Sequence, residues 1–232
     1  MKKSRTRILA ATITLVIFLL LSIIILPFNT TKSFDADEYN FASDFYIELD
    51  NEIPVMSQVT NFTCFAVSMA IVRNYFNLET TEESLLRELD MLSMNEGILP
   101  RDYLSYANKA FNPMSYSVSM LNPTSQAEIL NVVTESLLNK LPVIFFYSAI
   151  DDWNKPNYNT HYGVIYGLDM SKQIVKISNP YGYLEELTFT ELFEGLSFQS
   201  FESEPLLFHL GRVVGYIKPN NIFLLENDST EI

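Results

Sequence analysis

The sequence predicts an α+β fold, with helices in the first half of the folded body and an antiparallel sheet in the second. Between residues 64 and 140, apolar side chains recur at helical spacings of three and four. From residue 143 onward, short apolar runs separated by turn residues are typical of strands. The 232 residues show no internal repeat, and they suffice for one domain with a substantial core.

The chain begins with a basic stretch, residues 1–7, followed by residues 8–27, which carry no charge. The second stretch is long enough for one transmembrane helix. A cleaved signal peptide is the alternative, but its apolar part is usually only about 7–15 residues and ends in small residues. Residues 22–27 offer no such cleavage site. Because cations stay on the cytoplasmic side, we expect a single-pass anchor in a bacterial cell membrane, with an extracytoplasmic C-terminal domain.

The charge distribution supports the same division of the chain. Four of the 15 basic residues precede or flank the start of the apolar stretch, whereas all 28 acidic residues follow it. A body this acidic excludes nucleic acid as a partner, and its acidity serves to keep an exported domain soluble or, alternatively, to favour basic substrates. We expect a polar tether at residues 28–44, one folded domain at residues 45–225 and a short tail at residues 226–232. The domain is expected to be monomeric.

Four helices are predicted for the first half of this domain. The fourth has Ser125 and Glu128 at the spacing of a capping box, as Thr80 and Glu83 have before the second. Pro100 stands at a favourable first helical position of the third. The expected helices cover residues 64–77, 81–92, 100–110 and 126–140.

Strands are predicted for the second half. Apolar runs at residues 143–147, 161–168 and 173–178 are followed by two further strand candidates, at residues 212–217 and 221–225. A helical half that precedes an antiparallel half would leave a cleft between them. In such a cleft, a side chain from a helix can meet a side chain from a strand.

Cys64 is the only cysteine of the chain, so no disulfide within the chain is available to stabilise the domain. Buried, unreactive cysteine is common. Cys64, however, stands at or near the N-terminus of the first predicted helix, where unpaired backbone N–H groups and the helix dipole favour a negative charge. Such a position lowers the pKa of a thiol from about 8.5, and we therefore expect Cys64 to be a nucleophile.

Three further residues are candidates for the groups that a cysteine nucleophile requires. His161 opens a predicted strand, and Asn179 follows the next strand eighteen residues later, so a hairpin would bring the two together. Gln58 precedes Cys64 by six residues and could donate to an oxyanion. Taken singly, each has an ordinary alternative: His161 as a satisfied polar residue, Asn179 as a turn former before Pro180, and Gln58 as a loop residue.

Together these residues resemble a known family, the papain-like cysteine peptidases that cleave double-glycine leader peptides of bacteriocins, and their stand-alone relatives. The matching segments are residues 53–58, 64–70, 141–144, 161–164 and 179–180, together with Gly97. The resemblance implies a papain-like fold in which Cys64 is the nucleophile, His161 the general base, Asn179 the orienting group and Gln58 the oxyanion donor. It also implies a peptide or protein substrate.

The sequence departs from this family in three respects. Phe65-Ala66 stands where Gly-Pro usually follows the cysteine, so Phe65 is expected to reshape the substrate site or to mark a domain without activity. Asn179 replaces a more usual aspartate, and an asparagine can orient an imidazole but cannot neutralise it. Leader-processing members are normally fused to a transporter, which does not fit in this chain, so leader cleavage is not implied.

We therefore expect a membrane-anchored cysteine peptidase with a Cys-His-Asn triad and a glutamine oxyanion donor. The alternatives are an inactive papain-like domain that binds a surface partner, and a thiol acyltransferase or cell-wall amidase. Trp153 is a candidate substrate contact on a loop before His161, unless it simply packs on the body, and His209 is the reserve base. No cofactor or metal site is expected, since one cysteine and two histidines are so dispersed.

Overall fold

The computed structural model describes residues 44–93, 97–150, 158–197 and 218–227, together with Thr14 and Val16. None of the described helices is long and apolar enough to cross a membrane. The anchor expected at residues 8–27 lies outside the described residues except at Thr14 and Val16.

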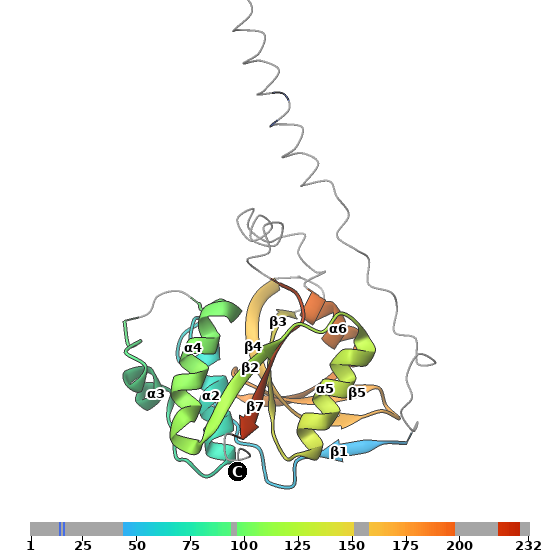
Figure 1. Cartoon of the computed structure of the whole chain (residues 1–232), viewed down its shortest axis with the longest axis horizontal. Helices are drawn as coiled ribbons and strands as arrows, with labels where there is room; N and C mark the ends of the chain where they lie inside the picture. The colour runs from blue at the N-terminus through green and yellow to red at the C-terminus, as the bar shows by residue number, and fades with distance from the viewer. Residues whose placement is uncertain are drawn as a thin grey trace, which may run out of the picture.

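An antiparallel sheet runs through the domain (Figure 1). Its strands follow the order β2-β7-β3-β4-β5-β6, and β1 pairs with β4 beside this path. Every described pair of neighbouring strands is antiparallel, which confirms the predicted α+β class. The strands are β1 (Tyr46–Glu48), β2 (Tyr116–Leu121), β3 (Val143–Ile150), β4 (Tyr158–Asp169), β5 (Ile174–Asn179), β6 (Tyr183–Thr188) and β7 (Asn221–Asn227).

Helices pack on this sheet from two sides (Figure 1). In the view of Figure 1, α2, α3 and α4 gather at one side of the strands, and α5 and α6 lie at the other. Helix α2 contacts β4, α4 contacts β2 and α6 contacts β3. The helices are α2 (Cys64–Tyr75), α3 (Glu82–Glu88), α4 (Pro100–Phe111), α5 (Gln126–Leu138) and α6 (Phe189–Ser197), with a 3₁₀ turn at Asn112–Met114.

Helix α2 is the central helix of the domain, because eleven of its twelve residues are buried. Its two small residues Ala66 and Ala70 are fully buried, as are Val67 and Ile71. A helix that is apolar on all sides belongs inside a core. This burial fixes the position of the first residue of α2, which is Cys64, and places it against β4.

Helix α3 begins at Glu82, one residue later than predicted, and ends at Glu88 instead of near residue 92. Thr81 is the N-cap, and its side chain and that of Ser84 each accept a hydrogen bond from the backbone N–H of the other. Thr80, the predicted cap, instead donates its hydroxyl to the carbonyl of Leu78 and its N–H to the side chain of Asn74. The predicted Thr80–Glu83 box was therefore wrong, although the helix exists.

The division into a helical half and a strand half is also incomplete. Strands β1 and β2 lie in the first half, whereas β6 and α6 follow β5 in the second. Strand β7 extends to Asn227, so the folded domain reaches beyond the predicted boundary at residue 225. The strand expected at residues 212–217 lies outside the described residues.

Candidate active site

The candidate site lies where the N-terminus of α2 meets β4. Cys64 is the first residue of α2, and the carbonyl of Thr63 accepts hydrogen bonds from the backbone of Ala66 and Val67. Thr63 caps the helix without a side-chain bond to its N–H groups, because its hydroxyl interacts with Thr60. The helix start therefore leaves backbone N–H groups near the sulfur of Cys64, where the dipole favours a negative charge.

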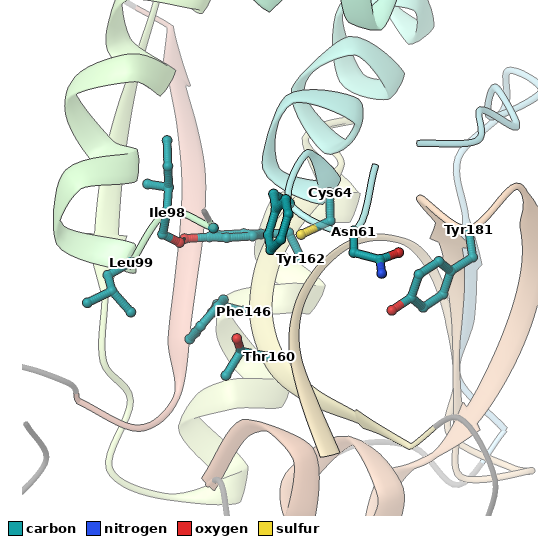
Figure 2. A pocket seen from close by; sticks show the side chains of 10 residues that line it. Asn61, Cys64, Ile98, Leu99, Phe146, Thr160, Tyr162 and Tyr181 are labelled. Carbon is teal, nitrogen blue, oxygen red and sulfur yellow. The ribbon is translucent and has the colours of Figure 1, made fainter. Parts of the chain in front are cut away.

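A pocket of about 660 Å³ opens beside this sulfur (Figure 2). Cys64 has only 6% of its surface exposed and is one of the residues that line this pocket. Tyr162 and Thr160 of β4 line the pocket too, on either side of His161 in the sequence. The remaining lining residues are both apolar and polar: Asn61, Phe62, Gly97, Ile98, Leu99, Phe146 and Tyr181.

His161 lies inside β4 and not at its start as predicted, because the strand begins at Tyr158 and pairs His161 with Tyr147 of β3. Asn179 is the last residue of β5. The Nε2 atom of His161 and the Oδ1 atom of Asn179 are 2.9 Å apart, and both side chains are 1% exposed. The hairpin between them thus brings these two side chains together.

The hydrogen bonds of Asn179 decide which tautomer of His161 is present. The backbone N–H of Tyr181 donates to Oδ1 of Asn179 (2.9 Å), and Nδ2 of Asn179 donates to the carboxylate of Glu185 (2.7 Å). Turning the amide over would set a donor against the Tyr181 N–H and an acceptor against the carboxylate. Because Oδ1 is an acceptor, Nε2 of a neutral His161 must carry the proton, and Nδ1 is then free of a proton and able to act as a base.

Tyr181 covers the imidazole of His161. The two rings are stacked, with centroids 4.3 Å apart and planes 8° from parallel. Tyr181 also lines the pocket beside Cys64. The ring of Tyr181 therefore restrains the imidazole and shields it from water.

Burial governs the charge state of the two candidate catalytic groups. It raises the pKa of the Cys64 thiol to about 11, an effect partly opposed by backbone N–H groups of Tyr162, Phe65 and Cys64 itself. Burial lowers the pKa of His161 to about 4, against the opposing hydrogen bond to Asn179. The thiol pKa is thus raised and not lowered as expected from the helix start alone, because desolvation outweighs the N–H groups. At neutral pH the site holds a thiol and a neutral imidazole.

The peptide group that joins His161 to Tyr162 lies against the sulfur, since the N–H of Tyr162 acts on the Cys64 thiol. This contact connects the nucleophile candidate on α2 directly with the strand that carries the base candidate.

Gln58 is held next to the Asn179 turn by its backbone. Its N–H donates to the carbonyl of Pro180 (2.7 Å), and Ser57 forms a β-bridge with Tyr181. Its Nε2 donates to the carbonyl of Thr60 (2.8 Å), while its Oε1 is buried without a hydrogen-bond partner among the described residues. One hydrogen on Nε2 is therefore taken up by Thr60, which leaves the second as a possible donor. Gln58 is not among the residues that line the pocket.

Three other residues singled out from the sequence have different outcomes. Phe65 is completely buried and does not line the pocket, so its side chain packs in the core and the expected role as a substrate contact is not supported. The reason is geometric, because the second residue of a helix buried on all sides faces inward. Trp153 and His209 lie outside the described residues.

Two neighbours of the site carried no signal in the sequence. Tyr181 reaches His161 because a tight turn ends at Gly182, and Glu185 reaches Asn179 because β6 folds back on β5. Only the register of these strands reveals such contacts. No three His, Cys, Asp or Glu side chains are grouped to hold a metal ion in the part of the chain that the structure describes.

Comparison with known proteins identifies one family model and several solved structures that are similar to this chain. The family model described as "Peptidase_C39 like family" matches residues 50–202. A putative C39-like peptidase from Bacillus anthracis shares the fold with a TM-score of 0.53 at 15% identity, over 79% of this chain and 98% of that one. A double glycine motif protease from an AMS/PCAT transporter, solved in complex with a leader peptide, gives a TM-score of 0.46 at 14% identity, over 79% and 99% of the two chains. No curated protein matches the sequence.

Proposed function

Because this chain belongs to the Peptidase_C39 like family, we propose that it is a cysteine peptidase in which Cys64 attacks peptide or amide bonds and His161 is the general base. The observation that carries this proposal is the hydrogen bond from His161 to Asn179, whose amide orientation leaves Nδ1 of His161 as a base. A base with a fixed tautomer, on the strand that contacts the cysteine, is what an uncharged thiol needs to become a nucleophile.

The reaction begins when Nδ1 of His161 takes the proton of the Cys64 thiol as the sulfur attacks the substrate carbonyl. A carbon–sulfur bond forms, and the negative charge moves to the carbonyl oxygen. The backbone N–H of Cys64 and the Nε2 of Gln58 are the proposed donors to this oxyanion. Asn179 keeps the imidazolium in place, because its Oδ1 accepts the Nε2 proton throughout.

Collapse of this intermediate breaks the carbon–nitrogen bond. Nδ1 of His161 gives its proton to the leaving amine, and the acyl group remains on Cys64 as a thioester. A water molecule then attacks the thioester while Nδ1 accepts its proton. That proton returns to the sulfur as the carboxylic acid is released, so the site regains its thiol and neutral imidazole.

The substrate that we propose is a peptide or protein segment in extended form. The pocket beside Cys64 is lined by the apolar side chains of Ile98, Leu99 and Phe146 and by the polar side chains of Asn61 and Thr160. The three apolar side chains suit an aliphatic or aromatic substrate side chain near the bond to be cleaved. We further propose that residues 8–27 hold this domain at the extracytoplasmic face of a membrane, which would restrict its substrates to that side.

Labelling with an uncharged peptidyl fluoromethyl ketone tests the proposal, because this electrophile needs an activated thiol within a peptide-binding site. Intact-mass analysis of the full-length protein should show one adduct, on Cys64, whose formation slows by at least about 100-fold in His161→Ala. Cys64→Ala, the control, should remain unlabelled. Equal labelling of the native protein and of His161→Ala would remove the proposed role of His161. A native Cys64 that does not react at all would favour an inactive domain that only binds a partner.

A further inference from the structure

The hydrogen-bond chain that begins at His161 does not end at Asn179. Its next member is Glu185 of β6, whose Oε1 accepts from Nδ2 of Asn179 at 2.7 Å. The hydroxyl of Tyr147 is also 3.4 Å from this oxygen. Both neighbouring groups donate hydrogen bonds, so this environment favours Glu185 as an accepting carboxylate.

The strand register explains why Glu185 reaches Asn179. Glu185 is paired with Ile177 of β5, and Asn179 lies two residues further along that strand, on the same face. Residues in this diagonal relation are close enough for a long side chain to bridge. Glu186, the next residue of β6, points to the opposite face and is exposed.

We propose that Glu185 is a positioning residue for His161, acting through the amide of Asn179. The carboxylate binds the NH₂ group of Asn179 and thereby keeps Oδ1 turned toward Nε2 of His161. It also sets a negative charge one side chain beyond the imidazole, which stabilises the imidazolium that forms during proton transfer. This role rests on the proposed function, in which Nδ1 of His161 is the base.

The other groups around this relay do not duplicate the contact. Tyr183 and Tyr147 offer only hydroxyls to Nδ2 of Asn179, at 3.3 and 3.5 Å. Glu191 accepts from the backbone N–H and the hydroxyl of Thr188 at the start of α6. Of the side chains that the structure describes, those that face the His161 ring are Asn179, Tyr147 and Tyr181. Among the described residues, Glu185 is thus the carboxylate bonded to Asn179.

Partial burial disfavours the charged form of Glu185, and the two donors partly compensate for it. The pKa of Glu185 is raised by burial, and the hydrogen bonds from Asn179 and Tyr147 oppose that rise. An asparagine in place of aspartate cannot supply a negative charge to an imidazole. Glu185 supplies this charge indirectly, because the side chain of Asn179 lies between it and the imidazole.

The test is the tautomer of His161, measured by ¹⁵N NMR on full-length protein labelled at histidine. The chain has two histidines, and a His161→Gln sample assigns the signals. In the native protein we expect the Nε2–H tautomer. Glu185→Leu should give a mixture of tautomers, and iodoacetamide should modify the single thiol about 10- to 100-fold more slowly at pH 7, as loss of a hydrogen bond to a charged group predicts.

Two further variants complete the design. Glu186→Leu is the matched control and should keep both the native tautomer and the native alkylation rate. Glu185→Gln retains an acceptor but not the charge, so it should keep the tautomer, lower the pKa of His161 and slow alkylation less than Glu185→Leu. It also serves if Glu185→Leu fails to fold.

The outcomes separate this inference from the proposed function. Changed tautomer and alkylation in the Glu185 variants, but not in Glu186→Leu, support the positioning role even if the native protein cleaves no peptide from an internally quenched library. In that case only the proposed function fails. Glu185 variants that fold and keep the tautomer, the His161 pKa and the alkylation rate of the native protein overturn the inference, whatever the peptidase assay shows.

Discussion

Asn179 is the residue on which the chemistry of the site depends most, because it receives Nε2–H of His161 on one atom and donates to Glu185 from another. Because of this pairing, the residue type that position 179 can accept depends on the carboxylate at position 185. An aspartate at position 179 would face the Glu185 carboxylate at a distance where two negative charges cannot coexist. The departure from the more usual aspartate therefore has a local physical reason.

Asn179→Asp is predicted to harm this protein although aspartate is the commoner residue in the resembled family. Two carboxylates about 2.7 Å apart should lower the free energy of unfolding by about 2 kcal/mol or more at pH 7. Adding Glu185→Gln should restore most of that loss, because the glutamine amide can donate to the new aspartate. Urea unfolding of the two single variants and the double variant measures this coupling, and strictly additive effects would argue against it.

His161 makes a second prediction, on the pH dependence of stability. Its pKa is about 4 in the folded protein against 6.5 as an ordinary value, so between these values the unfolded chain binds more protons. Stability must then fall as the pH falls through this window. We expect the free energy of unfolding to drop by about 2 kcal/mol more between pH 7.5 and pH 5 in the native protein than in His161→Gln.

The comparison of the two proteins removes the contributions of other groups, His209 included, since both chains contain them. Parallel curves for the native protein and His161→Gln would show that His161 titrates normally in the folded state.

At the scale of elements, the site depends on the turn from β5 to β6, which carries Asn179, Tyr181 and Gly182. Gly182 has a φ of +93°, and a Cβ atom there would lie 2.9 Å from the Cβ of Ser57. The close approach lets Gln58 donate its N–H to Pro180. The loop before α2 and the β5–β6 turn are thus fixed to one another at this glycine.

Gly182→Ala should lower the free energy of unfolding by about 1–3 kcal/mol, from the positive φ and from the contact with Ser57. Gly97→Ala is the matched control, because nothing lies within 4 Å of an added Cβ there. It should change stability by less than about 0.5 kcal/mol. Chemical denaturation of both variants checks the prediction, and equal effects at the two glycines would contradict it.

The sequence predicted the elements whose pattern is set by burial on one or more sides. Helices α2, α4 and α5 and strands β3, β4, β5 and β7 lie close to their expected positions. Strand β1 has only three residues, and β6 is mostly exposed, so neither has an apolar pattern that a sequence can reveal. The contact between His161 and Asn179 was predicted from a hairpin, whereas Tyr181 and Glu185 depend on strand register and were missed.

The charge state of Cys64 was a different kind of error. A helix N-terminus is visible in a sequence, but the depth at which α2 is buried is not. Eleven buried residues in that helix place the thiol where desolvation is the larger effect.

At the scale of the whole molecule, the proposal combines a membrane anchor with a domain that acts outside the cytoplasm. The full-length protein should sediment with membranes and stay there after extraction with 1 M salt, about the concentration at which surface charges are screened beyond 3 Å. A chain that lacks residues 1–31 should be recovered in the soluble fraction. Recovery of the full-length protein without membranes would contradict the anchor and leave the proposed chemistry untouched.

The central claim is that the Cys64, His161 and Asn179 side chains together hydrolyse peptide bonds. Its most direct test is the initial rate of cleavage of an internally quenched peptide library by the full-length protein, beside Cys64→Ala, His161→Ala and Glu186→Leu. We predict turnover by the native protein and by Glu186→Leu, background rates for Cys64→Ala and a loss of at least about 100-fold for His161→Ala. Cleavage by Cys64→Ala at the native rate, or no cleavage of any library member by the native protein, would contradict the claim.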